Sequence, residues 1–173
     1  MKDALAIHRW LLAHQIHHEI VRLPRMLTSA EELPEVLSAD PASCVGVTVF
    51  EVTTRLGPEV VAVVAPVGAP PRSGTVGGVL DVRRVRPASA FTVNSATDYA
   101  AGLICPLLLP TGLTVLVDER LTRIGGPVHT PTGERHAALR IDAGDLLELV
   151  PGKIVDLSVP RPRGEPMTAR LVG

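Results

Sequence analysis

Two neighbouring stretches, CVGVTVFEVTT at residues 44–54 and EVVAVVAPV at residues 59–67, decide the fold that this sequence predicts. Both are rich in β-branched residues, which favour strands. Only the sequence RLGP, residues 55–58, lies between them. Because so short a connection joins antiparallel neighbours, we expect a β-hairpin. The second stretch is apolar throughout, so we expect it to be a central strand.

Upstream of the hairpin, the pattern predicts two helices and one strand. Apolar residues at helical spacing favour a helix over residues 3–14, and alternation favours a short strand over residues 16–24. The sequence TSAEE at residues 28–32 has the pattern of a capping box. A second helix is therefore expected there, with Pro34 in or just after its first turn.

Downstream of the hairpin, the sequence GAPPRSGTVGG at residues 68–78 contains enough glycine and proline to predict a loop. We expect a small helix, capped by Ser95 or Thr97, to lead into Gly102. The remaining expected elements are a short element over 79–85, strands over 113–118, around Val128 and over 137–141, and a helix over 143–149 capped by Asp142.

This order of short elements predicts a mixed α/β domain of the α+β kind, with a mostly antiparallel sheet flanked by short helices. The chain has 173 residues, 46% of them hydrophobic, which suits a single compact domain with one sizeable core. We assign this domain to residues 1–159. Residues 160–173 show no periodicity, and we expect them to form a flexible C-terminal tail.

Composition limits the contacts that the protein can make with nucleic acids. Aromatic residues are only 2% of the chain, which excludes a large base-stacking platform, and the net charge of -1 gives no general attraction to polyanions. Any nucleic-acid contact must be local. The densest basic cluster, Arg83, Arg84 and Arg86, is either a solvated face or a contact for a phosphate backbone.

The two cysteines, Cys44 and Cys105, have the spacing of neither a disulfide framework nor a zinc site. The sequence contains no signal-peptide pattern and no uncharged run long enough to cross a bilayer. We therefore expect free thiols and a soluble, cytoplasmic protein without a membrane partner.

Few patterns in the chain suggest a catalytic or metal site. His14, His17 and His18 are close in sequence, but they lack the HExxH order of a zinc helix, and no GxSxG elbow occurs. Cys105, beside Pro106, is either a thiolate nucleophile or a small residue that lines a pocket. The second interpretation is favoured because no neighbouring basic residue would lower the pKa of its thiol. We expect no metal and no cofactor.

One passage, VNSATDYAAGLICPLLLPTGLTVLVDERL at residues 93–121, resembles the most specific passage of the YbaK and prolyl-tRNA synthetase editing-domain family. In that family a short helix, a Gly-x-x-x-Pro loop and a strand ending in VDESL or similar follow one another. The sequences LLAHQIHHEIVRLP at 11–24, EVVAVVAPV, and TPTGERHAALRIDAGDLLEL at 130–149 resemble, in the same order, the opening helix and strand, the central strand and the closing segment. The matching residues include Gly102, Pro106, Gly112, Asp118, Leu121, Gly133, Asp145 and Leu146.

The resemblance implies a trans-acting aminoacyl-tRNA deacylase, which hydrolyses the ester of a mischarged tRNA in translation quality control. It implies as partners the acceptor end of tRNA and, further, an aminoacyl-tRNA synthetase. A glycine lets substrate approach the backbone, and N–H groups beside a proline turn can hold an oxyanion while water attacks. The implied catalytic residues are Gly102, through its backbone, and Thr48. The implied substrate-binding residues are Val47, Cys105, Pro106, Gly112, Asp118 and Gly133, and the implied tRNA contacts are Arg83, Arg84 and Arg86.

One feature departs from the family pattern. The family carries a lysine in a KTL stretch on the strand before the central one, and the matching stretch here is VGVTVFE. The lysine position falls on Val47, or on Gly46 if the register shifts by one. The chain has only two lysines, Lys2 and Lys153, both far from this strand in sequence. Either the catalysis is rearranged, with Arg55 as one candidate cation, or the protein is a non-catalytic member that binds a tRNA end or a small ligand.

Overall fold

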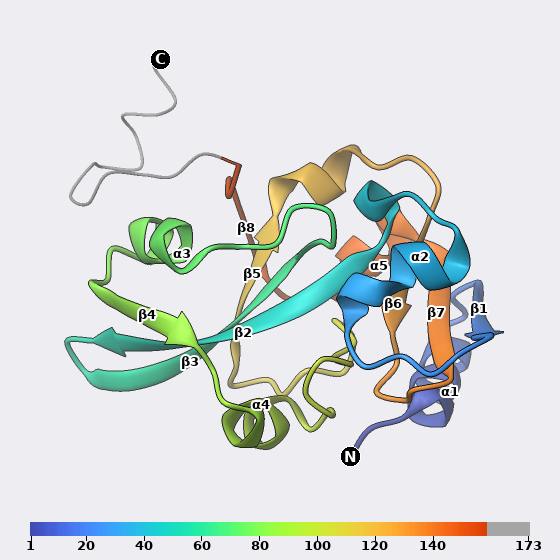
Figure 1. The fold of residues 1–173 in the computed structure, drawn as a ribbon, viewed down its shortest axis with the longest axis horizontal. Coiled ribbons are helices and arrows are strands. Elements are labelled where there is room, and N and C mark those ends of the chain that lie inside the picture. The colour runs from blue at the N-terminus through green and yellow to red at the C-terminus, as the bar shows by residue number, and fades with distance from the viewer. Residues whose placement is uncertain (159–173) are drawn as a thin grey trace.

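A computed structural model describes residues 1–158, which form two β-sheets with short helices around them (Figure 1). The tail expected over 160–173 lies outside the described residues. The larger sheet has the strand order β4 (Arg84–Pro87), β2 (Val45–Thr54), β3 (Gly57–Pro66), β5 (Thr114–Asp118) and β8 (Lys153–Val155). The smaller sheet has the order β1 (His18–Arg22), β7 (Ala137–Asp142) and β6 (Pro127–Pro131).

The hairpin of β2 and β3 is the longest pairing in the molecule and confirms the prediction from residues 44–67. The two strands are antiparallel in register from Val45 opposite Pro66 to Thr54 opposite Gly57. Strand β3 lies at the middle of its sheet, as expected. The pairing of β5 with β3 and with β8 is parallel, while every other ladder is antiparallel. The α+β class with mostly antiparallel sheets is confirmed, and the strands divide into two sheets.

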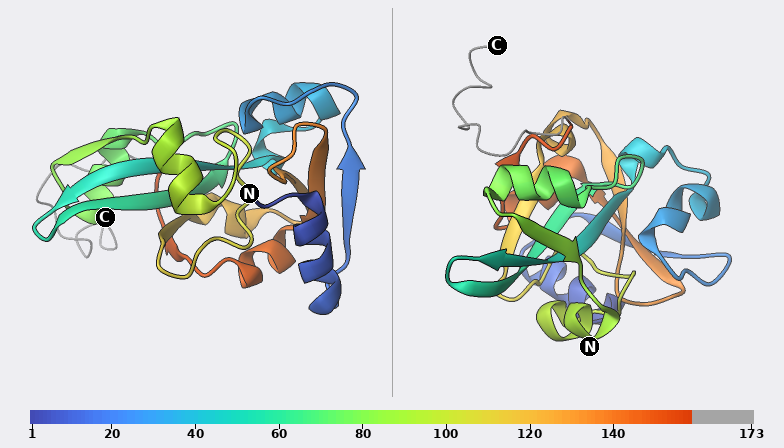
Figure 2. Two further views of the ribbon diagram at one scale, coloured as in Figure 1. Left: turned by 90° about the horizontal axis from the view of Figure 1, so that it is seen from below. Right: turned by 60° about the vertical axis from the view of Figure 1, so that its left-hand side comes forward.

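The second half of β3 is buried on both faces of the larger sheet, which explains why residues 60–66 are apolar. Ala62 and Val64 face a core cluster that lies between the two sheets, and Val61 and Val63 face a second cluster beneath α3 (Ser73–Leu80). The helix α4 (Ala90–Thr97) covers the first face, so α3 and α4 lie on opposite sides of the hairpin (Figure 2). We call the cluster between the sheets the inner cluster and the cluster beneath α3 the outer cluster, and we name the two faces of the larger sheet inner and outer after the cluster that each one contacts.

The predicted capping box and the predicted Asp142 cap both form, and Asp3 adds a further cap. Asp3 accepts a hydrogen bond from Ala6 N at the start of α1 (Ala4–Ala13), and Asp142 caps α5 (Ala143–Leu149). A capping box opens the 3-10 turn η1 (Ala30–Glu32), which runs into α2 (Leu33–Leu37) with a proline in its first turn. Two further 3-10 turns, η2 (Pro41–Ser43) and η3 (Glu119–Arg123), complete the described helices.

Two local predictions are wrong. Residues 68–78 are not a loop throughout, because α3 begins at Ser73. Burial of Val76, which is 0% exposed and packs with Phe50, outweighs the low helix propensity of the glycines. The helix before Gly102 is capped by Ser89, not by Ser95 or Thr97, because the Ser89 hydroxyl accepts from Thr92 N. Within residues 79–85 the chain leaves α3 and enters β4, and β8 was not anticipated.

Candidate functional site

The loop from Gly102 to Pro106 is attached to the chain segment that precedes α2. The Gly102 carbonyl accepts a hydrogen bond of 2.9 Å from Ala30 N. Gly102 has φ +84°, and a Cβ on it would lie 2.5 Å from the Thr28 carbonyl oxygen. Only glycine fits this conformation and this close approach. The loop therefore has its position because residue 102 has no side chain.

The segment that holds Gly102 is itself well ordered by hydrogen bonds. The Glu32 carboxylate accepts from Thr28 N at 2.9 Å, from Ser29 N at 3.0 Å and from the Thr28 hydroxyl. These hydrogen bonds, the one from the Thr28 side chain foremost, hold the pKa of Glu32 below its usual value. The predicted capping box thus has a second role, because it fixes the surface on which the Gly102 loop rests.

The two ends of the loop are also held. The Tyr99 hydroxyl, fully buried, donates to the Leu107 carbonyl at 2.6 Å, and Asn94 of α4 accepts from Ala101 N at 2.9 Å. Residues 103–107 are buried, whereas Gly102 is exposed. The N–H of Gly102 donates to no group within residues 1–158. The loop is therefore a rigid cradle that presents the backbone of one glycine to solvent.

The structure brings Val47 to the loop side of the sheet but not Thr48. Val47 packs against the inner cluster, which includes Ile104 and Cys105 of the loop. Thr48 lies opposite Val63, whose side chain belongs to the cluster on the other face. Strand alternation puts Gly46 on that other face too. Of the two positions to which the family lysine can correspond, Val47 is the one on the same side as the loop.

Lys2 is far from the loop in sequence, but the fold brings its side chain close to Tyr99 at the start of the loop. Its ammonium lies 5.4 Å from the centre of the Tyr99 ring and 3.9 Å from the Asp98 carboxylate. Its backbone N–H donates to the Asp98 carbonyl. Arg55, in contrast, is eight residues beyond Val47 along the hairpin, roughly 26 Å for an extended strand. Lys2 is thus next to the start of the loop, and Arg55 is at the far end of the hairpin.

Cys105 has the environment of an inert thiol. Its side chain is fully buried, and this burial raises the pKa of the thiol to about 12. Hydrogen bonds from Leu107 and Tyr99 and the charge of Lys2 act in the opposite direction but do not offset burial. The thiol stays protonated at neutral pH, so the residue fits the wall of the loop better than the role of nucleophile.

The other sequence-predicted residues are distributed more widely. The buried Asp118 carboxylate points to the outer face and binds Arg120 Nη2 at 2.6 Å and Nε at 3.1 Å. Gly112 is exposed and lines a separate cavity of about 430 Å³. Gly133, with φ +92°, lies against the Lys2 backbone and the Tyr99 ring, where a Cβ would approach to 2.5 and 3.0 Å. Gly133 therefore supports the start of the loop, while Asp118 and Gly112 lie away from it.

Thr130 is a polar residue of this region that the sequence reasoning missed. It lies on β6, on the same side as Val128 of the inner cluster, and is 0% exposed. Its hydroxyl has no hydrogen-bond partner among the described residues, and the neighbouring His129 Nδ1 has none either. Burial lowers the pKa of His129. A buried hydroxyl without a partner is uncommon in native proteins, because its desolvation costs free energy.

Replacing Thr130 by valine is expected to raise the free energy of unfolding by about 1 kcal/mol, because valine has the same shape and leaves no unpaired hydroxyl. Urea denaturation measures this change. Thr132→Val is the matched control: Thr132 is equally buried, but its hydroxyl donates to the Ala137 carbonyl at 3.0 Å, so stability should fall. Equal losses at both positions would show that Thr130 has a partner.

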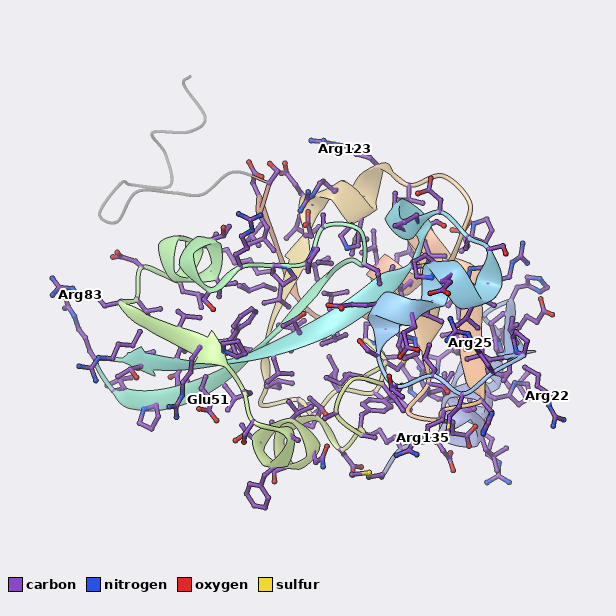
Figure 3. All side chains as sticks on the ribbon, in the orientation of Figure 1. Arg22, Arg25, Glu51, Arg83, Arg123 and Arg135 are labelled. Atoms are coloured by element: carbon purple, nitrogen blue, oxygen red, sulfur yellow. The ribbon has the colours of Figure 1, made fainter. Side chains whose placement is uncertain are left out.

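Arg83, Arg84 and Arg86 line one cavity of about 750 Å³ together with Glu51, Glu59 and Thr92. Arg86 pairs with Glu51 at 2.7 Å, and these two residues are cross-strand neighbours. Glu51 is on the inner face, four residues from Val47, or roughly 13 Å along the strand. Figure 3 shows Glu51 and Arg83 toward the free end of the hairpin, far from Arg22, Arg25 and Arg135.

Two of the three histidines near the end of α1, His14 and His18, make contacts within the protein. His14 Nδ1 lies 2.8 Å from the Trp10 carbonyl oxygen, and His18 Nε2 lies 2.8 Å from His8 Nδ1. Residues 1–158 contain no group of three His, Cys, Asp or Glu side chains suited to hold a metal ion. A helix of the length and apolarity needed to cross a membrane is absent from the same residues.

The fold and the loop define a class of protein: an α+β domain whose candidate site is a main-chain loop fixed by a glycine. The family model for the aminoacyl-tRNA editing domain matches residues 25–149, and the chain belongs to this family. The matched range includes β2, the Gly102 loop and the strands of both sheets except β1 and β8. The resemblance found in the sequence is thereby confirmed. No curated protein sequence matches the chain significantly.

Solved structures share the fold. The crystal structure of the hypothetical protein APE2540 is 21% identical, with a TM-score of 0.74, over 87% of this chain and 97% of that chain. A proposed trans-editing enzyme for prolyl tRNA synthetase is 22% identical, with a TM-score of 0.70, over 87% and 93%. A proposed signal transduction protein from Marinobacter aquaeolei VT8 is 14% identical, with a TM-score of 0.55, over 87% of this chain and 30% of that one. At these identities the likeness shows the fold alone.

Proposed function

We propose that the protein is a trans-acting aminoacyl-tRNA deacylase that hydrolyses the ester of a mischarged tRNA. The observation that carries the proposal is the exposed Gly102 backbone, fixed by its contact with Ala30 in a chain of the editing-domain family. The Gly102 N–H, which has no acceptor within residues 1–158, is suited to stabilise the oxyanion that forms when water attacks the ester carbonyl. Val47, half-buried above the buried Ile104 and Cys105, gives the apolar wall a surface suited to an aminoacyl side chain.

A panel of mischarged tRNAs incubated with the purified protein tests this proposal. We expect the half-life of at least one ester to shorten strongly, while a correctly charged tRNA is spared by the selectivity of the wall. Ester half-lives equal to the uncatalysed ones across the whole panel would contradict deacylase activity. The panel also identifies the amino acid, because the size of the residue removed reports the space available at the wall.

A second candidate function is a non-catalytic protein that binds a tRNA end or a small ligand. This candidate is favoured by Val47, because an uncharged side chain stands where the family pattern has a lysine. The two candidates differ in one readout, because a binding protein retains tRNA affinity without shortening any ester half-life. Electrophoretic mobility or anisotropy with uncharged tRNA, measured beside the panel, separates them.

Cys105→Ala is expected to leave the rate of deacylation within about twofold of the original, since a thiol with a pKa of about 12 is not a nucleophile at neutral pH. Single-turnover rates at saturating protein measure this. The buried cavity left by the sulfur lowers stability by about 1 kcal/mol, which thermal denaturation reports separately. Loss of the chemical step with a folded protein would restore the thiol mechanism.

Arg84→Ala is expected to weaken tRNA binding and to lower the slope of log affinity against log salt by about 0.7 to 0.9, the value for one phosphate contact. Arg84 lines the cavity that lies on the inner face beyond Val47. Arg123→Ala is the control, because this exposed arginine pairs with Glu119 on η3, away from the hairpin (Figure 3). Equal effects of both variants would mean that binding depends only on total charge.

A further inference from the structure

A further cavity, of about 320 Å³, lies on the outer face of the larger sheet at the N-terminus of α3. Arg72, Thr75, Arg120 and Ser158 contribute to its walls. The helix packs Val76 against Phe50 of the outer cluster, so this cavity and the Gly102 loop are on opposite faces of the sheet. Nothing in the deacylation proposal uses it.

The first turn of α3 has free backbone donors. Arg72 occupies the N-cap position and makes no side-chain cap, and the first helical bond runs from Val76 N to the Arg72 carbonyl at 3.0 Å. Within the described part of the chain, the N–H groups of Ser73, Gly74 and Thr75 have no acceptor. Arg72 and Thr75 of this turn line the cavity, so the first turn of the helix lies at its wall. Such N–H groups favour an anion, and the helix dipole adds to the effect.

Thr75 is an independent sign of a ligand. The residue is only 4% exposed and lines the cavity, yet its hydroxyl makes no hydrogen bond to any residue from 1 to 158. Among the described residues, the side-chain polar atoms that are both completely buried and without a partner are His129 Nδ1 and the Thr130 hydroxyl oxygen. The Thr75 hydroxyl oxygen, which also has no partner there, is therefore not completely buried. The little surface that Thr75 exposes therefore includes its hydroxyl oxygen, which opens on the cavity. A buried hydroxyl in this state lacks a partner that a bound oxyanion would supply.

The Arg120 guanidinium is oriented at the cavity by an ion pair. Asp118 accepts from Arg120 Nε and Nη2, and this hydrogen bonding raises the pKa of Arg120. Arg120 Nη1 has no acceptor among the described residues, so this nitrogen of the guanidinium can donate hydrogen bonds to a ligand. Arg72 adds an exposed cation at the rim.

Acidic groups limit the net charge of the cavity. Asp118 neutralises Arg120, and Asp156 also attracts it while accepting a hydrogen bond from Ser158 N at 2.9 Å. The positive charges of Arg72 and Arg120 are therefore matched by the negative charges of Asp118 and Asp156. Recognition must therefore come from directed donors, namely the free N–H groups, the Thr75 hydroxyl and Arg120 Nη1, rather than from a general positive field. Tetrahedral oxyanions with several acceptor oxygens match such a set.

We propose that this cavity binds a phosphate group of a nucleotide or of a nucleic-acid backbone. The phosphate oxygens accept from the first-turn N–H groups of α3 and from the Thr75 hydroxyl, and the arginines at 72 and 120 close the site. The site stands on its own geometry, so its existence does not depend on deacylation at Gly102.

The test is a titration of the ¹⁵N-labelled full chain with inorganic phosphate, against sodium chloride at equal ionic strength. We expect saturable shifts of the Gly74 and Thr75 amide signals with phosphate alone. Thr75→Val and Arg72→Ala should each weaken binding by about tenfold, the effect of losing one charge-assisted hydrogen bond. Thr75→Ser, which keeps the hydroxyl, should bind as the original does, and Thr75→Ala replaces the valine variant if that one fails to fold. Arg123→Ala, with the same change of charge outside the cavity, should change nothing.

Absence of saturable shifts, or equal affinity in the original, Thr75→Val and Arg72→Ala, would overturn the proposal. Competition separates the two sources of phosphate. Adenosine 5′-monophosphate that displaces phosphate more strongly than an acceptor-stem RNA identifies a free nucleotide, and the reverse order identifies a nucleic-acid backbone. Failure of both to displace phosphate would also overturn the proposal. The mischarged-tRNA panel is unaffected by any of these results, so the two proposals fail separately.

Discussion

Gly102→Ala is expected to lower the free energy of unfolding by about 2–4 kcal/mol and to abolish deacylation. Alanine at φ +84° costs about 1 kcal/mol or more in backbone strain. In addition, its Cβ would lie 2.5 Å from the Thr28 carbonyl, so the loop must move and the hydrogen bond from Ala30 N to the Gly102 carbonyl is lost. The exposed N–H then leaves the position that Ala30 gives it. Urea denaturation and single-turnover deacylation measure the two effects.

The matched control for this variant is Gly112→Ala. Gly112 follows the same loop, is exposed, and has open space around the position of a Cβ, without the positive φ of Gly102. Stability and rate should stay close to the original values. Gly102→Ala with unchanged activity would show that the main chain at residue 102 is not part of the site. Equal losses in both variants would show that any alanine in this region is harmful.

Most of the fold could be predicted because local pattern and tertiary burial agree. The hairpin has β-branched strands around a short turn, and the Asp142 cap lies directly before an apolar helix. The prediction failed at α3, where three glycines in the helix indicate a loop and only the packing of Val76 against Phe50 explains the helix. Sequence periodicity contains no information about that distant contact.

The candidate site was predictable in its loop but not in its surroundings. Gly102 and Pro106 are recognisable because a positive φ and a fixed turn demand particular residue types. Lys2, in contrast, reaches Tyr99 from a position almost a hundred residues away in sequence, and no local pattern marks such a contact. Thr48 and Asp118 were grouped with the loop by their motifs, yet strand alternation turns both to the outer face.

Val47→Lys is expected to raise the rate of deacylation at saturating tRNA by about tenfold or more, since a positioned donor at a developing oxyanion typically contributes at least this factor. Val47 is half-buried on the inner face with the loop, so the hydrocarbon stem of lysine can cover the apolar wall while its ammonium reaches the solvent side near Gly102. Affinity for tRNA should change little, because one added cation corresponds to at most one phosphate contact. Single-turnover kinetics and equilibrium binding, measured on the same variant, separate the rate from the affinity.

Val47→Met is the control, because it gives a side chain of similar length without a charge. If the rate of deacylation rises in the lysine variant alone, the side chain at residue 47 faces the reacting ester. The size of that increase then distinguishes the deacylase from the non-catalytic binding protein. A protein that is inactive as it stands and becomes a deacylase with lysine is a binding member of the family. A protein that is already active and gains tenfold stabilises the oxyanion by other means, with the Gly102 N–H foremost. An unchanged rate in an active protein would contradict this position for residue 47 and move the reacting carbonyl toward Lys2, whose ammonium lies beside Tyr99 at the start of the loop.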